Sequence, residues 1–347
     1  MISFNATNRG SARTRRRVLV PAALALMAML ASLPGGAAPK AAPARKPARP
    51  VKQAERPKTE ASRVEADVPV VAPAELSLPP VEEYELENGL KVFGIRDELP
   101  QFSIVAGASF GKLYEGRMNA GLSELLAKAL TLGGSKRYPG DRLHDAIESI
   151  GGRITIEASW ETVGISIRVL ERHADLALDI LADLLENPAL DERSIADAKA
   201  ILIEEIRRKN DSPAALAVEK LREIMFDGMG YGSNPSEQSI KSIGQAELRT
   251  AFNNHFRAAN MVVGTVSGPD AAGTRARVEK ALSKLERGAR INYRFDADRA
   301  ASAMRAGSKR IYFIRRPIPQ ATIVVGTLAP PLADPSSHAL GVMNYIL

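Results

Sequence analysis

From residue 81 onward, short apolar runs and turn residues alternate in a way that predicts β-strands. The first run, VEEYELENGLKVFGIRDE at 81–98, has apolar halves on either side of Asn88-Gly89, the residue pair that most favours a tight hairpin turn. Three further stretches show alternating or continuous apolar positions: 102–111, 153–170 and 261–268. Because 153–170 alternates over most of its length, it predicts two paired strands.

Between these strands the apolar positions recur with helical spacing. Helices are predicted at about 120–132, 141–150, 172–186, 191–209, 213–226 and 270–286. Gly151-Gly152 ends the second helix, and Pro188 and Pro213 separate later ones, because glycine commonly ends a helix and proline interrupts it. This order of elements predicts the α+β class, in which helices cover an antiparallel sheet.

The same patterns divide the chain into parts. Residues 81–286 form the predicted first domain, and residues 287–307, rich in charge and alanine, form a linker. Residues 308–347 begin a new set of strands and then a helix. About 40 residues are too few to bury a core by themselves. We therefore expect a truncated second domain of the same type as the first.

The first 80 residues carry no pattern of a folded domain. Residues 1–37 have the parts of an export signal: arginines at 13–17, an apolar run at 18–31 and small residues near Gly35. The run is shorter than the roughly 20 residues of a membrane span, and TRRRVL fits either general secretory or twin-arginine export. Residues 38–80 are a spacer rich in Pro, Ala and Lys. We expect an exported protein of the periplasm or cell envelope, with membrane contact only through an uncleaved leader.

The net charge of +7 belongs to this leader and spacer. Residues 1–60 hold 12 basic and 2 acidic residues, which leaves 35 basic and 38 acidic residues in the rest of the chain. The body therefore offers no basic field for a nucleic acid. The chain contains no cysteine, which excludes a disulfide, a thiolate metal site and a lipoprotein anchor.

Four ordered stretches carry a family resemblance. They are ENGLKVFGI with GASFGKLYE, then AGLSELLAKALTLGGSKRYPG, then ILIEEIRRKNDSP, and finally HFRAANMVVGTVSG. Together they resemble the pitrilysin/insulinase family of zinc metallopeptidases, which includes the subunits of the mitochondrial processing peptidase. The likeness covers about 83–347 and implies a metallopeptidase half-unit. In that family two half-units enclose a chamber, and one half-unit can keep the zinc while the other forms part of the substrate-binding wall.

The family's catalytic helix carries H-x-x-E-H, in which two histidines hold zinc and the glutamate activates a zinc-bound water. The resemblance places those histidines at Glu124 and Lys128 and the base at Ala127. The remaining family ligand, a glutamate on a later helix, corresponds to Glu205. Because Ala127 cannot take a proton and Lys128 brings a cation to the metal's place, we expect no catalytic residue, no metal ligand and no cofactor. Glu205 is then a relic ligand position.

A hypothesis for this change follows from the residues. Glu124 and Lys128 are four residues apart on one helix, with the acid first, which is the favourable order for an ion pair. If Glu205 faces them, the ammonium of Lys128 lies between two carboxylates. A fixed protein cation would then replace the zinc and avoid an unpaired charge on Glu205. The alternative is that Glu124 and Lys128 belong to an ordinary solvated helix face.

Other candidate sites are weaker. The histidines, at 144, 173, 255 and 338, lie far apart, and none has a His or Glu partner in ligand register. GMGYGSNPSE at 228–237 is rich in glycine, but it lacks the strand before it and the helix after it that a phosphate-binding loop requires, so it does not indicate a nucleotide site. No motif places a base beside a serine or threonine nucleophile.

These observations favour a catalytically inactive peptidase-family subunit. It would pair with a zinc-bearing subunit of the same family as a heterodimer and help to enclose a peptide or unfolded polypeptide. Two alternatives stay open. One is an active zinc metalloendopeptidase with non-standard ligands, and the other is a stand-alone peptide-binding protein of the envelope.

Overall fold

The computed structural model describes residues 79–347 except 227–229, 269–272, 294–295, 297, 299–300, 303–310 and 347. The predicted export signal at 1–37 and nearly all of the predicted spacer at 38–80 lie outside the described residues. So does part of the predicted linker at 287–307.

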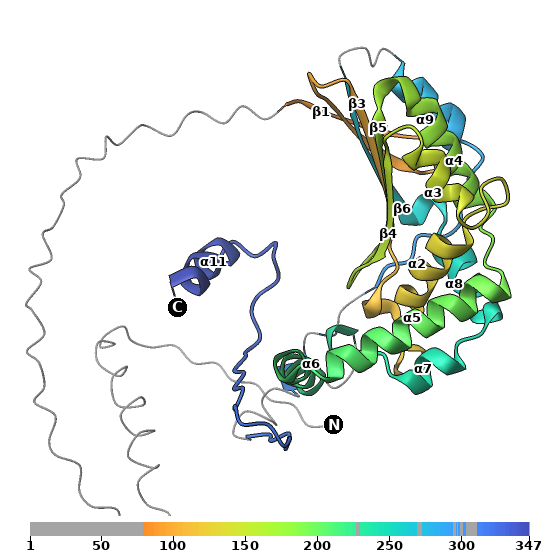
Figure 1. The fold of residues 1–347 in the computed structure, drawn as a ribbon. Coiled ribbons are helices and arrows are strands. Elements are labelled where there is room, and N and C mark those ends of the chain that lie inside the picture. The colour runs from red at the N-terminus through yellow and green to blue at the C-terminus, as the bar shows by residue number, and fades with distance from the viewer. Residues whose placement is uncertain are drawn as a thin grey trace, which may run out of the picture. The chain divides into compact units, whose positions relative to one another are not determined.

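Six strands form one sheet in the order β1-β2-β6-β3-β5-β4 (Figure 1). Their bounds are β1 Val81–Glu85, β2 Lys91–Arg96, β3 Gln101–Ala108, β4 Arg153–Ala158, β5 Val163–Leu170 and β6 Met261–Ser267. β1 and β2 form the predicted hairpin, in which Gly89 adopts a φ of 85° that favours glycine. The predicted pairing of two strands within 153–170 is confirmed as β4 and β5.

The sheet is antiparallel except where β2 pairs with β6. β2 and β3 run in opposite directions and are joined by a short turn, yet they are not neighbours. β6 lies between them and is antiparallel to β3, so it must be parallel to β2. The predicted α+β class is confirmed, and the sheet is mixed rather than wholly antiparallel.

Helices pack on one side of this sheet, where the core lies (Figure 1). Their bounds are α2 Leu122–Gly133, α3 Arg142–Glu148, α4 Ala174–Glu186, α5 Glu192–Asn210, α6 Pro213–Met225, α7 Glu237–Ser242, α8 Gln245–His255 and α9 Thr274–Leu282. Alternate positions of the strands face this layer and are buried, among them Ile104, Ile165 and Val263. On the other face of the sheet Val105 and Val262 stay 48% and 45% exposed.

Hydrogen bonds hold the segment that follows α9 against the domain. After α9, the backbone carbonyls of Glu286 and Arg287 accept hydrogen bonds from the N–H groups of Ala258 and Ala259. The buried amide of Asn260 then accepts a hydrogen bond from the N–H of Ile291 at 3.2 Å. The first residues of the predicted linker are therefore attached to the segment just before β6.

Residues 311–346 contain one helix, α11 Ser337–Ile346, and no strand. The helix lies where the sequence predicts one, whereas the strands predicted before it are not formed in the described part. Many large apolar side chains of this segment are exposed, including Phe313, Ile323, Val325 and Tyr345. No helix in the described ranges is long and apolar enough to cross a membrane.

Candidate functional site

The helix that corresponds to the family's catalytic helix, α2, is anchored by a residue outside it. Its N-cap is Gly121, which has a φ of 94° and no side chain to cap the helix. The buried carboxylate of Glu115 takes that role and accepts hydrogen bonds from the N–H of Gly121 and of Ser123, both at 2.7 Å. The Ser123 hydroxyl donates a third at 2.5 Å. Burial raises the pKa of Glu115, while these hydrogen bonds act in the opposite direction.

Glu124 and Lys128 lie one turn apart on the accessible side of α2. The intervening residues Leu125 and Leu126 are fully buried, and Ala127 is 3% exposed. Helical spacing explains this, since residues four apart share a face while those between them point elsewhere. The position of the expected base therefore holds a buried methyl group without a proton acceptor.

Lys128 and Glu205 meet, as the resemblance requires. Glu205 lies on α5, a helix that begins after the Asp191 cap, whose side chain accepts a hydrogen bond from the N–H of Ser194. The Lys128 Nζ lies 2.8 Å from the Glu205 Oε1, and the two side chains are 31% and 53% exposed. A lysine ammonium thus occupies the space beside the one remaining ligand position.

Glu124 has a different partner from the one expected. Its Oε1 forms an ion pair with Nζ of Lys112, at 2.6 Å. Lys112 belongs to a short 3-10 turn, Lys112–Tyr114, that follows β3. Lys128 is therefore paired with Glu205, and Glu124 with Lys112, so that each carboxylate has its own cation. The sequence does not predict this pairing because Lys112 lies outside both helices.

These donors do not fit a zinc ion. A catalytic zinc needs three protein ligands of the His, Asp, Glu or Cys type and an open position. Here two carboxylates are each neutralised by a lysine, and no group of three or more possible ligands occurs in the described part of the chain. No hydrolytic step can be derived from Glu124, Ala127 and Lys128.

A single tryptophan, Trp160, stands at the tip of the β4–β5 hairpin, next to this site. The tip packs on the turn before α2, where Leu113 N–H donates to the Trp160 carbonyl at 2.9 Å. Gly111 permits this close approach, because a Cβ there would lie 2.7 Å from three backbone atoms of the tip. Tyr231 donates its hydroxyl proton to Glu161 at 2.5 Å, and burial first, then this contact, raises the pKa of Tyr231 to about 12.

Two cations contact Trp160, and a third lies close enough to interact with both of them. The Lys112 Nζ lies 4.9 Å and the Arg222 Cζ 5.1 Å from the centre of a Trp160 ring. Lys209, at the end of α5, forms an ion pair with Glu219 of α6. Burial lowers the pKa of Lys209, and the nearby charges of Lys112 and Arg222 lower it further, against the opposing effect of Glu124. Sequence inspection misses this group because its members lie on four separate elements.

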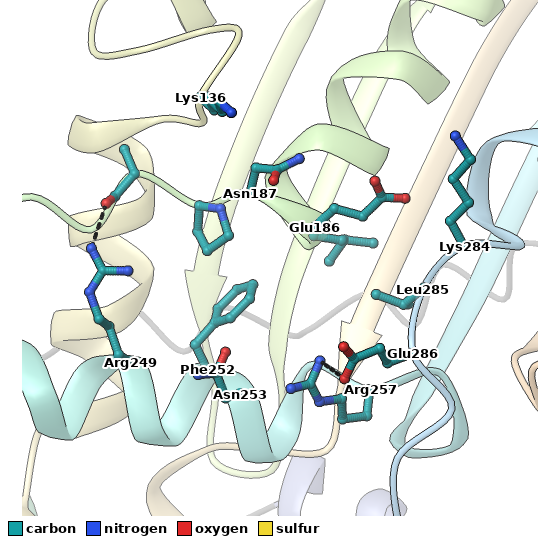
Figure 2. A pocket seen from close by; sticks show the side chains of 13 residues that line it. Lys136, Glu186, Asn187, Arg249, Phe252, Asn253, Arg257, Lys284, Leu285 and Glu286 are labelled. Atoms are coloured by element: carbon teal, nitrogen blue, oxygen red, sulfur yellow. Dashed lines mark hydrogen bonds and ion pairs between the residues drawn. The ribbon is translucent and has the colours of Figure 1, made fainter.

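A cavity of about 700 Å³ elsewhere in the described part of the chain shares no residue with this site (Figure 2). It lies where the end of α4, α8 and the segment after α9 come together. Arg249 reaches from α8 to the carbonyl of Ala189, and Arg257 forms an ion pair with Glu286 at 2.9 Å. Both arginines thus hold the surrounding segments together, and no base stands beside a nucleophile there.

Two of the histidines, His255 and His144, contact backbone carbonyls. His255 stacks on Phe110 with ring centres 4.3 Å apart, and its Nδ1 lies 3.1 Å from the carbonyl oxygen of Ser109. Burial lowers the pKa of His255. His144 lies on α3, with its Nε2 3.3 Å from the carbonyl oxygen of Thr131. Both rings bind backbone carbonyls.

A mixed sheet covered by helices on one face, with a degenerate counterpart of a metal helix, defines a domain of the metallopeptidase half-unit class. Residues 104–235 match the family described as Insulinase (Peptidase family M16), and residues 242–347 match the Peptidase M16 inactive domain. The chain belongs to the M16 peptidase family, and the predicted resemblance is confirmed. The second match starts before β6, so strands of one sheet are divided between the two matched ranges.

Curated relatives and solved structures agree with this assignment. Cytochrome b-c1 complex subunit 1 of Bos taurus is 24% identical over 78% of this chain and 56% of its own length. A probable mitochondrial-processing peptidase subunit beta of Arabidopsis thaliana is 25% identical over 78% and 51%. An uncharacterized zinc protease of Rickettsia felis is 24% identical over 70% and 57%. The chain spans about half the length of these curated relatives.

Two solved structures show the same fold. A protease from Helicobacter pylori has a TM-score of 0.57 and 16% identity, and covers 63% of this chain and 53% of its own. The periplasmic protease PqqL from Escherichia coli has a TM-score of 0.56 and 16% identity, and the match covers 63% of this chain and 26% of that one.

Proposed function

We propose that this protein is a catalytically inactive M16 subunit that pairs with a zinc-bearing member of the same family. Together the two subunits would enclose a peptide or unfolded polypeptide. The observation that carries the proposal is the ion pair between Lys128 and Glu205, which stands where the family resemblance places the metal. With a cation bound to the last ligand position and alanine at the position of the base, the chain needs a companion for catalysis.

The scaffold around the lost site is kept, which supports a role in binding. α2 is buried along one side and anchored through Glu115, and α5 still packs against it. Retention of α2 and α5 without a metal site is expected if these two helices form part of the wall of the chamber that encloses the peptide. We therefore propose no catalytic residue and no cofactor in this chain, with Glu205 as a relic.

The edge of the sheet supports peptide as the bound species. Among the described residues β4 is the last strand on its side of the sheet, so one row of its backbone N–H and C=O groups has no partner strand there. β4 also packs against α2. An extended peptide can add to such an edge through main-chain hydrogen bonds. A peptide added there would lie beside the degenerate site.

Two further parts of the proposal rest on the relatives. Several are named as subunits of larger assemblies, which supports a paired assembly. One neighbour in structure is titled a periplasmic protease, and together with the predicted leader this supports export to the periplasm or cell envelope. Cell fractionation with a tagged full chain tests the location.

The decisive experiment is native purification of the tagged full chain from its source cells, followed by mass spectrometry and a zinc assay. A purification of the tag alone is the control. We expect an M16 companion with an intact H-x-x-E-H motif in equal amount, and zinc in proportion to that companion. A protein that elutes alone and contains zinc would indicate an active peptidase with other ligands, whose cleavage a chelator would abolish. Elution alone without zinc would indicate a stand-alone binding protein.

A further inference from the structure

One of the cations beside Trp160, Arg222, forms no ion pair among the described residues. Lys112 is paired with Glu124 and Lys209 with Glu219. For Arg222 the structure gives a contact with the Trp160 ring and, among the described residues, no carboxylate within ion-pair distance. This group, which we call the Trp160 cluster, comprises Trp160, Lys112, Lys209 and Arg222. Two of its three cations are ion-paired, and the Glu161 carboxylate beside Trp160 is bound by the Tyr231 hydroxyl, so Arg222 is the group of the cluster that can accept a further carboxylate.

The geometry of the cluster suits a carboxylate. Arg222 is exposed on α6, and its contact with the indole limits the orientations of its side chain. A guanidinium offers two parallel N–H donors that match the two oxygens of a carboxylate. Lys112 uses one bond to Glu124 and its ammonium has further donors. An anion held between these groups would also relieve the repulsion that the neighbouring cations exert on Lys209.

The cluster also stands in line with the free sheet edge. β4 ends at Ala158, and Trp160 follows two residues later at the hairpin tip. A peptide added along β4 would therefore reach the cluster at one end of the strand. Lys112 connects the cluster directly to α2 through Glu124. The cation-rich group thus lies between the edge strand and the degenerate site.

We propose that the Trp160 cluster binds a carboxylate of the enclosed peptide, either an Asp or Glu side chain or the C-terminal carboxylate. This inference rests on the proposed function, because it names the chemistry of the peptide that the subunit helps to enclose. It assigns Arg222 as the main specificity-determining residue, with Lys112 and Lys209 as supporting charges.

Trp160 is the only tryptophan of the chain, so its fluorescence reports on the cluster directly. The test uses the full chain and four acetylated nine-residue peptides of alternating Thr and Val. The central residue is Glu or Gln, and the C-terminus is a carboxylate or an amide. We expect the doubly neutral peptide to bind about tenfold more weakly than the peptide that carries the preferred carboxylate, in accord with a charge-assisted hydrogen bond. The two singly charged peptides distinguish the side chain from the C-terminus.

Two variants locate the effect. Arg222→Gln is expected to abolish the preference for the charged peptide and to leave the affinity for the neutral peptide unchanged. Arg208→Gln is the matched control, because Arg208 is an exposed arginine on α5 whose ion pair in the described part of the chain is with Glu204 of its own helix. Equal binding of all four peptides would overturn this inference and leave the proposed pairing intact. If no peptide binds, both this inference and the peptide part of the proposed function are overturned. If Arg222→Gln and Arg208→Gln lose the preference for the charged peptide equally, the preference arises from general surface charge, and the inference is overturned.

Discussion

Glu115 allows a quantitative test of how α2 is held in place. Its carboxylate is 5% exposed and accepts three hydrogen bonds, two from backbone N–H groups at the start of α2 and one from the Ser123 hydroxyl. Glu115→Ala removes the acceptor and leaves three buried donors. A buried polar group without a partner costs about 1–3 kcal/mol. Because water can satisfy some donors in the vacated space, we expect the free energy of unfolding to fall by about 3–5 kcal/mol.

Two further variants separate the contributions. Glu115→Gln keeps one acceptor oxygen but loses the negative charge beside the positive end of the helix dipole, so we expect a loss of about 1–2 kcal/mol. Glu148→Gln is the control, because Glu148 is an exposed glutamate of α3 whose side chain forms no hydrogen bond or ion pair in the described part. A surface substitution of that kind changes stability by about 0.5 kcal/mol or less.

The assay is urea unfolding of the full chain, followed by far-ultraviolet circular dichroism and by Trp160 fluorescence. Comparing the two signals checks that α2 and the hairpin tip unfold together. A cost below about 1 kcal/mol for Glu115→Ala, well under the unpaired-donor estimate, would refute the view that this carboxylate anchors the helix. So would a cost equal to that of Glu148→Gln.

Four further predictions concern the site and its surroundings. A double-mutant cycle of Lys128→Met and Glu205→Gln should give a coupling energy of about 0.2–1 kcal/mol, because both side chains are substantially exposed; a value above about 2 kcal/mol would contradict that range. Glu124→His with Lys128→His should create a one-to-one zinc site with Glu205 but no peptidase activity, and isothermal titration without zinc uptake would show that Glu205 is out of ligand register. Gly111→Ala should destabilise the domain by about 2–3 kcal/mol in urea unfolding, since its Cβ would meet the backbone of the hairpin tip. Tyr231 should ionise near pH 12 in an ultraviolet titration; because this pKa lies above the ordinary 10.0, its contribution to stability should be intact below pH 10 and lost as the pH rises toward 12.

Local patterns were enough to predict most of the elements. The Asn88-Gly89 turn, the alternation in 153–170 and the helical periodicity of α2, α4, α5 and α6 each arise from neighbouring residues. The meeting of Lys128 with Glu205 came from the family resemblance, because their separation of 77 residues carries no local signal.

Other features depend on contacts that no local pattern encodes. The sequence indicates that 261–268 is a buried strand, but its place between β2 and β3 depends on how the helices return the chain to the sheet. The pairing of Glu124 with Lys112 depends on the path of the turn between β3 and α2. The Trp160 cluster requires a hairpin tip, a turn and two helices to converge. Its residues show no spacing in the sequence that would distinguish them from ordinary surface positions.

The position of β6 has a consequence for how the chain folds. The β1–β2 hairpin and the β3–β5–β4 group are connected by the short turn between β2 and β3, but within the described sheet their strands pair only through β6. A nascent chain that has emerged only as far as α7 therefore exposes two open strand edges, one on β2 and one on β3. Pairing over such long sequence distances is slow, and open edges favour aggregation. Folding of this domain must wait until about residue 267 is synthesised, and a chaperone that shields β2 and β3 until then would raise its yield.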